Sequence, residues 1–230
     1  MVTNTSIESR AREDLTTAIT LLERIGIIDF NGHFSVRLPD GNILINSGSS
    51  VRCAIGMDDF VVVTPDGTAP ENAPAELPLH LAVYQARPDV HAVVHGHPEW
   101  STLLSSTGHD YQVVLPQGAL LGAVPVFESP MSVNNDRIAG AVARKLAGGR
   151  ATLLRAHGSV VTGKDVLETT VMAIYLELNA ERQVRAGMLG MPYVFTQEET
   201  ASLRASLDKR GLFEKCWRYY VARFGLQGQT

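Results

Sequence analysis

Apolar residues recur every three or four positions in several parts of the chain, which is the spacing of a helix that buries one face. The first of these patterns ends at Gly26, and the longest is expected to end at Gly187, because glycine commonly follows the last turn of a helix. The predicted helices cover about 5–25, opened by the capping box of Thr5 and Glu8, then about 76–88, about 134–146, about 165–186, and a segment that begins at Thr196.

Short apolar runs bounded by turn residues predict strands between these helices. They cover residues 33–38, 42–46, 59–64, 91–97, 111–115, 124–129 and 151–163. Neighbouring strands often join through short turns, which favours an α/β fold with a largely antiparallel sheet covered by helices. There is no internal repeat or linker in the sequence, so we expect residues 1–230 to form a single domain, with 191–230 as a C-terminal helical tail.

Composition narrows the class of protein. The 230 residues include 45% hydrophobic positions, enough for a substantial core. The net charge is −4 and there is no block of lysine and arginine, which argues against a nucleic-acid-binding protein. Cys53 and Cys216 are too few for a disulfide framework, and neither a signal peptide nor a membrane span is present. We therefore expect a cytoplasmic protein.

The segment 92–100, AVVHGHPEW, ends an apolar run with two histidines. On a strand, His95 and His97 point to the same side, and two imidazoles directed at one point suggest a metal. His157 ends another apolar run and could complete a three-histidine site with open positions. Such a site suits zinc, cobalt, iron or manganese. The alternative is a pair of polar histidines that bind nothing.

Glu76 opens the helix that precedes this strand. Its carboxylate could be a fourth ligand or a general acid/base beside the metal, or an ordinary residue of the first helical turn. His80 lies one turn later and is expected to be a buried, hydrogen-bonded histidine rather than a ligand. His91 shares the strand face but lies roughly 13 Å from His95 at the rise of a strand, too far to join it.

The segments NGHFSVR (31–37), HLAVYQARPDVHAVVHGHP (80–98, preceded by Glu76) and ATLLRAHG (151–158) resemble, in order and spacing, the class II aldolase/adducin family. The resemblance covers roughly residues 10–190. It implies a single-domain α/β/α sandwich with a central, mostly antiparallel sheet. It also implies a homo-oligomer, a tetramer or an octamer, with active sites between subunits. By position, His95, His97 and His157 match the family's metal ligands for Mn²⁺ or Zn²⁺, and Glu76 matches its catalytic carboxylate.

Departures from the family pattern bear on the substrate. Sugar-phosphate aldolases of this family hold the phosphate with a Gly-Asn pair, a threonine and two serines. Here these positions read Gly32-His33, Asn46 and Pro74-Ala75, which removes hydroxyl donors and argues against a phosphorylated substrate. The family's catalytic tyrosine also has no clear match. The residues left to bind substrate are His33, Asn46, Ser47, Gly48 and Arg155.

This pattern is most similar to family members that decarboxylate hydroxylated aromatic or heteroaromatic acids, of the 3-hydroxy-2-methylpyridine-4,5-dicarboxylate decarboxylase type of vitamin B6 degradation. The resemblance therefore implies a metal-dependent carbon–carbon lyase that acts on a small aromatic or pyridine (di)carboxylate. Its partners are further copies of the chain, with no nucleic acid or membrane. An aldolase or epimerase acting on an unphosphorylated sugar or keto acid is the first alternative. A non-catalytic, adducin-like interaction domain is the second.

Overall fold

A computed structural model describes residues 4–226 of the chain. Its strands form a seven-stranded sheet in the order β3-β2-β1-β4-β7-β6-β5. Each neighbouring pair in this sheet is antiparallel except β5 and β6, so the predicted sheet type is confirmed. The strands are β1 (His33–Arg37), β2 (Ile43–Asn46), β3 (Phe60–Val63), β4 (Ala92–Gly96), β5 (Val126–Phe127), β6 (Ala151–Leu154) and β7 (Gly158–Gly163).

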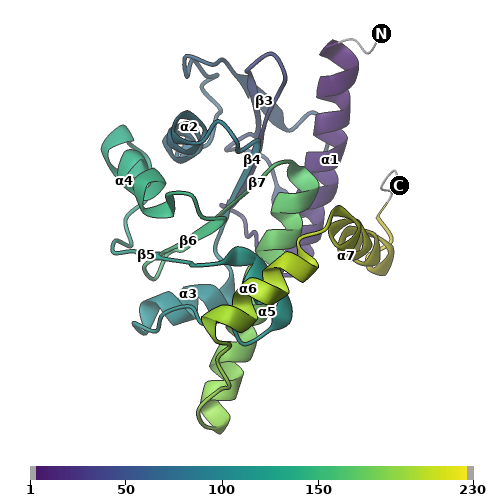
Figure 1. Cartoon of the computed structure of the whole chain (residues 1–230). Coiled ribbons are helices and arrows are strands. Elements are labelled where there is room, and N and C mark those ends of the chain that lie inside the picture. The colour runs from purple at the N-terminus through teal and green to yellow at the C-terminus, as the bar shows by residue number, and fades with distance from the viewer. Residues whose placement is uncertain (1–3, 227–230) are drawn as a thin grey trace.

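Helices cover both faces of this sheet, with α1, α5 and α7 on one side and α2 and α4 on the other (Figure 1). The α-helices are α1 (Asn4–Arg24), α2 (Leu77–Ala86), α3 (Glu99–Ser106), α4 (Asp136–Leu146), α5 (Val166–Leu189), α6 (Gln197–Leu207) and α7 (Arg210–Arg223). Two short 3-10 helices, η1 (Arg52–Ala54) and η2 (Pro116–Leu121), lie in the connections. No helix of residues 4–226 is long and apolar enough to cross a membrane.

Alternation along β4 divides the interior into two cores. Ala92 and Val94 pack with α1 and α5, while Val93 packs with α2 and α4. Because successive side chains of a strand point to opposite faces, one apolar run serves both cores. By the same alternation His95 lies on the α2 side, together with His33 and Ser35 of the neighbouring strand β1.

Three secondary-structure predictions were wrong in detail. The run 111–115 is not a strand, because the backbone amides there donate to Asn179 and Gln183 of α5 instead of to a neighbouring strand. The run 151–163 is two strands joined by a turn. Helix α5 continues through Gly187 to Leu189, and α3 was not predicted.

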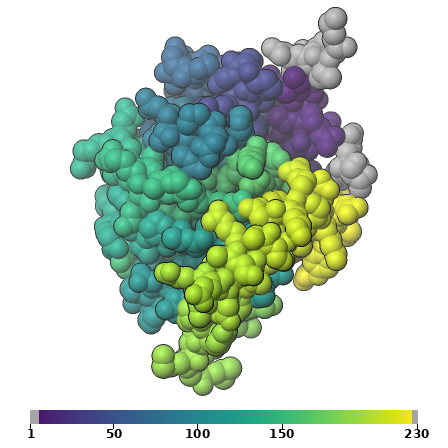
Figure 2. Space-filling model, in the orientation of Figure 1, coloured from purple at the N-terminus to yellow at the C-terminus, as the bar shows by residue number. Residues whose placement is uncertain are grey.

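The C-terminal end of α5 and the segment after it extend beyond the rest of the molecule (Figures 1 and 2). Met188, Leu189 and Met191 are 80%, 93% and 99% exposed there. The chain then returns through α6 to α7, where Phe213 and Trp217 are buried against the core of α1 and α5. These two aromatic residues anchor the C-terminal helical tail to the rest of the domain.

Candidate metal centre

The end of β4 approaches the loop after α1 unusually closely. A Cβ atom at Gly96 would lie 2.1 Å from the carbonyl oxygen of Ile27, and one at Gly158 would lie 2.3 Å from the carbonyl oxygen of Gly96. Only glycine tolerates such contacts, so these two residues allow β4 and the start of β7 to sit against this loop. His95 and His97 flank Gly96 and are therefore fixed at a crowded edge of the sheet.

His157 comes from the turn between β6 and β7 rather than from a strand. Ala156 holds this turn with a φ of 52°, in the left-handed region, and its N–H donates to Oγ of Ser105 over 3.0 Å. The N–H of His157 closes the turn on the carbonyl of Leu154. Since β7 pairs with β4, the turn carries His157 to the same end of the sheet as His95.

Glu76, His95, His97 and His157 converge at this edge. Each offers one ligand atom, and these four atoms all lie within 4.8 Å of one another. The ring centroids of His95 and His157 are 5.0 Å apart, and those of His97 and His157 are 5.2 Å apart. The four residues that the sequence singled out are thus neighbours in space, at a separation that one ion can bridge.

The hydrogen bonds of the His95 and His97 rings leave one nitrogen of each ring available to bind a metal ion. Nδ1 of His95 lies 2.9 Å from the carbonyl of Ser159, which can only accept, so Nδ1 carries a proton, and in a neutral ring Nε2 has the lone pair. That Nε2 is buried and makes no hydrogen bond within residues 4–226, although it lies 3.2 Å from Oε2 of Glu76. Nδ1 of His97 lies 2.9 Å from Oδ1 of Asp29, which leaves its Nε2 available as well. Carbonyl and carboxylate partners of this kind typically orient metal-binding histidines.

Glu76 immediately precedes α2 and is 9% exposed. Its Oε1 accepts from the N–H of Val133 over 2.6 Å and from the hydroxyl of Ser132 over 2.9 Å. Burial by itself raises the pKa of this carboxyl. Hydrogen bonding and the neighbouring histidines His33 and His95 lower it by more, so the pKa of Glu76 lies far below its ordinary value. The side chain is therefore a carboxylate that accepts hydrogen bonds.

His33, which the sequence suggested as a substrate-binding residue, faces Glu76 instead. It is 3% exposed, and its Nε2 lies 3.4 Å from Oε2 of Glu76. Its Nδ1 lies 2.8 Å from Nε2 of His80, and burial lowers the pKa of His33 to about 4. His80 is fully buried and hydrogen-bonded, as expected. The structure thus places His33 behind the carboxylate, where it contacts protein on both ring nitrogens.

The loop 46–49 lies against the segment that leads to Glu76. The N–H of Gly48 donates to the carbonyl of Asn72, and a Cβ there would meet Ala73 at 3.3 Å. Ser47 is 4% exposed and its N–H donates to the carbonyl of Asp59. Asn46 accepts from the N–H of Phe34, while its Nδ2 is buried without a partner among the described residues. Substrate binding by Asn46, Ser47 and Gly48 stays a prediction.

Arg155, named from the sequence as a substrate-binding residue, lies elsewhere. A single strand over 151–163 would place Arg155 and His157 on the same face, but both lie in the turn after β6. The guanidinium of Arg155 pairs with Glu128 and donates to the carbonyl of Ser105. These contacts occupy the side chain away from the histidines, so we leave Arg155 out of the proposed site.

Two contributors to the site were missed. Asp29 fixes His97, and Ser132 together with the N–H of Val133 fixes Glu76. No pattern in the sequence relates Asp29 to His97, 68 residues further along the chain. The segment around Ser132 is irregular, and no spacing pattern relates it to Glu76 at a sequence separation of 56 residues.

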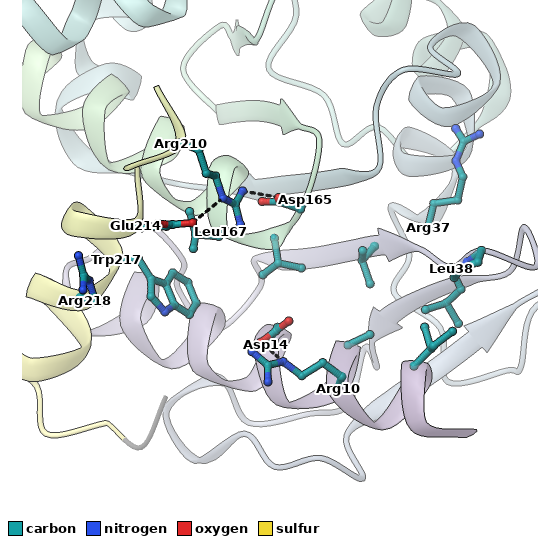
Figure 3. A pocket seen from close by; sticks show the side chains of 15 residues that line it. Arg10, Asp14, Arg37, Leu38, Asp165, Leu167, Arg210, Glu214, Trp217 and Arg218 are labelled. Atoms are coloured by element: carbon teal, nitrogen blue, oxygen red, sulfur yellow. Dashed lines mark hydrogen bonds and ion pairs between the residues drawn. The ribbon is translucent and has the colours of Figure 1, made fainter. Parts of the chain in front are cut away.

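Two cavities lie elsewhere. One of about 910 Å³ lies beside α2 and α4, and one of about 610 Å³ lies between α1, α7 and the far end of β1. In the second cavity, Arg210 pairs with Asp165 and Glu214, and Arg10 pairs with Asp14 (Figure 3). Neither is lined by a residue of the histidine cluster, so size alone does not identify the site.

Fold and cluster together are those of an α/β protein with a potential metal centre at one edge of an antiparallel sheet. Residues 13–184 match the class II aldolase and adducin N-terminal domain. The chain belongs to this family, as the resemblance implied.

Known relatives include decarboxylases. The 3,4-dihydroxyphthalate decarboxylase of Arthrobacter keyseri is 26% identical to this chain, in an alignment that covers 93% of this chain and 93% of the relative. The 3-oxo-tetronate 4-phosphate decarboxylase of Escherichia coli O6:H1 is 32% identical over 86% of this chain and 97% of its own. The solved structure of YgbL from Escherichia coli superposes with a TM-score of 0.77 at 30% identity, covering 86% of this chain and 99% of that one.

Proposed function

We propose that this chain is a divalent-metal-dependent lyase that decarboxylates a hydroxylated aromatic or pyridine (di)carboxylate. The observation that carries the proposal is the convergence of Glu76, His95, His97 and His157, whose ligand atoms lie within 4.8 Å of one another. Similarity to a dihydroxyphthalate decarboxylase along 93% of both chains supports the reaction class.

The three histidines would hold the cation through their available ring nitrogens. A divalent ion bound there, Mn²⁺ or Zn²⁺, supplies a Lewis acid for the substrate's hydroxyl and carboxylate oxygens. The orphaned Nε2 of His95 supports this role, because a buried acceptor without a partner is costly unless something satisfies it.

Glu76 would carry the proton. Decarboxylation breaks the bond between the ring and the carboxyl carbon, leaves the electron pair on the ring carbon, and replaces CO2 there by a proton. Glu76 would take the proton of the substrate's ring hydroxyl, whose acidity a bound cation would raise, and pass it to that carbon; its place beside the three histidines supports this role. The hydroxyl then recovers a proton from water when the product leaves.

The surroundings of Glu76 support a flat, apolar substrate. Pro74 is buried beside Gly48, where sugar-phosphate aldolases have a hydroxyl donor, and the neighbouring Ala75 also lacks one. Phe30, Val51 and Met131 are 79%, 61% and 63% exposed. Phe30 and Met131 adjoin residues that contact His97 and Glu76, respectively. Such exposed apolar groups suit burial by a ring or by a second copy of the chain, in line with a homo-oligomer that has sites between subunits.

The direct test of the proposed decarboxylation measures whether the protein releases CO2 or an aldehyde or ketone from candidate substrates. Metal-loaded protein is incubated with a panel of hydroxybenzoates, dihydroxyphthalates and a 3-hydroxypyridine dicarboxylate of vitamin B6 degradation. Hydroxy-sugars and an oxo-acid phosphate complete the panel, and chelator-treated protein is the control. CO2 from a hydroxyaryl acid, lost on chelation, is the expected result. Aldehyde or ketone fragments without CO2 would identify an aldolase instead. Turnover by the chelated protein would contradict the proposed role of the metal.

A further inference from the structure

Four buried side chains form a continuous hydrogen-bonded chain behind Glu76. Nδ1 of His33 lies 2.8 Å from Nε2 of His80, and Nδ1 of His80 lies 2.6 Å from Oγ of Ser35. Oγ of Ser35 in turn lies 2.8 Å from the hydroxyl of Tyr84. All four residues are at most 5% exposed, so water does not compete for these contacts.

Each contact in the chain can hold only one proton, so fixing one end fixes the direction of all the others. The fixed end is Glu76. Its Oε1 accepts from two donors, the hydroxyl of Ser132 and the N–H of Val133, as the oxygen of a carboxylate does. His95 has its proton on the side of Ser159, so a neutral His95 cannot donate to Glu76. The group left to face Oε2 with a proton is His33, whose Nε2 lies 3.4 Å away.

The remaining protons follow from this end. A neutral His33 with its proton on Nε2 has a lone pair on Nδ1, so His80 must donate to it from its own Nε2. Burial lowers the pKa of His80 well below its ordinary value, so its ring carries one proton and Nδ1 accepts. Ser35 therefore donates to His80 and accepts from Tyr84. The opposite direction would turn a second lone pair, beside that of His95, toward Oε2 of Glu76 and leave this oxygen with no donor from either histidine.

We propose that His80 is a positioning residue that donates a hydrogen bond to Nδ1 of His33 and thereby keeps the Nε2–H of His33 facing Glu76. His33 is then a donor that orients Oε2 of the carboxylate, and Ser35 and Tyr84 fix the ring of His80. The consequence for catalysis rests on the proposed function, in which Glu76 moves a proton. The protonation pattern itself does not depend on it.

The pattern can be measured on the protein without substrate. Uniformly ¹⁵N-histidine-labelled, chelator-treated protein is studied by solid-state NMR, with the rings of residues 33 and 80 assigned by the losses in His33→Gln and His80→Gln. We expect both rings to be neutral, with protonated Nε2 and unprotonated Nδ1. A proton on Nδ1 of either ring would overturn the proposal.

A pair of variants at one position gives the second test. His80→Gln has an amide N–H to donate to His33 and an oxygen to accept from Ser35, whereas His80→Leu has neither. We expect His80→Leu to bind metal normally and to keep KM while kcat falls about 100-fold, the usual cost of a misplaced group, and His80→Gln to recover most of the loss. Equal kcat in the two variants, or a loss that follows metal content, would refute the positioning role.

The two tests separate this inference from the proposed function. If no substrate of the panel releases CO2, the proposed function fails while the NMR result still decides the chain's direction. If CO2 is released but either ring is protonated on Nδ1, the reaction stands and the role of His80 falls.

Discussion

His97 and Asp29 are 68 residues apart in the chain, yet Nδ1 of His97 lies 2.9 Å from Oδ1 of Asp29. Asp29 also accepts from the N–H groups of Asn31 and Gly32, so the loop after α1 is tied to the end of β4 through one carboxylate. Burial by itself raises the pKa of Asp29. The contacts with His97 and with these amides lower it by more, so the pKa of Asp29 is below its ordinary value. An ionised Asp29 holds His97 with its Nε2 turned toward the cluster.

Replacement of Asp29 by asparagine tests this link. The amide oxygen can still accept from the loop amides, but the charge that orients His97 is lost. We expect the dissociation constant for Zn²⁺ or Mn²⁺ to rise about 10–100-fold, as for other outer partners of metal-binding histidines, measured by competition with a chromogenic chelator. Asp40→Asn, the same change in an exposed turn, is the control and should bind as the wild type does. Equal affinities in all three proteins would refute the role of Asp29.

The variant His157→Ala should no longer bind metal in stoichiometric amount. Removal of one of three imidazoles leaves too few strong donors for tight binding at neutral pH. Elemental analysis after dialysis measures the metal, and circular dichroism shows that the variant is folded. His91→Ala removes an exposed histidine before β4 and should bind metal fully. A metallated and active His157→Ala protein would contradict the assignment of the centre.

Glu76→Gln should retain the metal while turnover falls by roughly 10²–10⁴, the usual contribution of general acid/base catalysis. The amide oxygen can still accept from Ser132 and Val133, so the local fold is expected to persist. Turnover and metal content are measured on the same preparation. A rate equal to that of the wild type would reduce Glu76 to a structural residue.

Two glycine-to-alanine changes should have opposite effects on stability. A Cβ at Gly158 would lie 2.3 Å from the backbone of Gly96, whereas at Gly187 there is nothing within 4 Å. Gly158→Ala is therefore expected to lower the melting temperature, and to weaken metal binding because His157 adjoins it. Gly187→Ala lies within α5 and should stabilise the protein by about 0.4–1 kcal/mol. Thermal unfolding measures both, and a stable Gly158→Ala protein would mean that β4 and β7 can separate freely.

Much of this protein could be read from local patterns. Period, cap and turn signals located α1, α2, α4, α5, the start of α6 and six of the seven strands, because amphipathic spacing and helix ends are local properties of the chain. The strand at 151–154 was merged with its neighbour, since Arg155 and His157 continue an alternation that the backbone breaks at Ala156. The histidines and Glu76 were found because strand ends and a helix start placed them in recognisable settings.

By itself, the sequence determined which residues could ligate a metal and that they lie at or near the ends of strands and of a helix. Only the tertiary structure decided that His33 faces Glu76, that Arg155 turns to Glu128, and that Asp29 holds His97. The reason is physical: spacing fixes which side of a strand or helix a residue occupies. The partner of a buried polar group, in contrast, depends on which distant segment packs against that side.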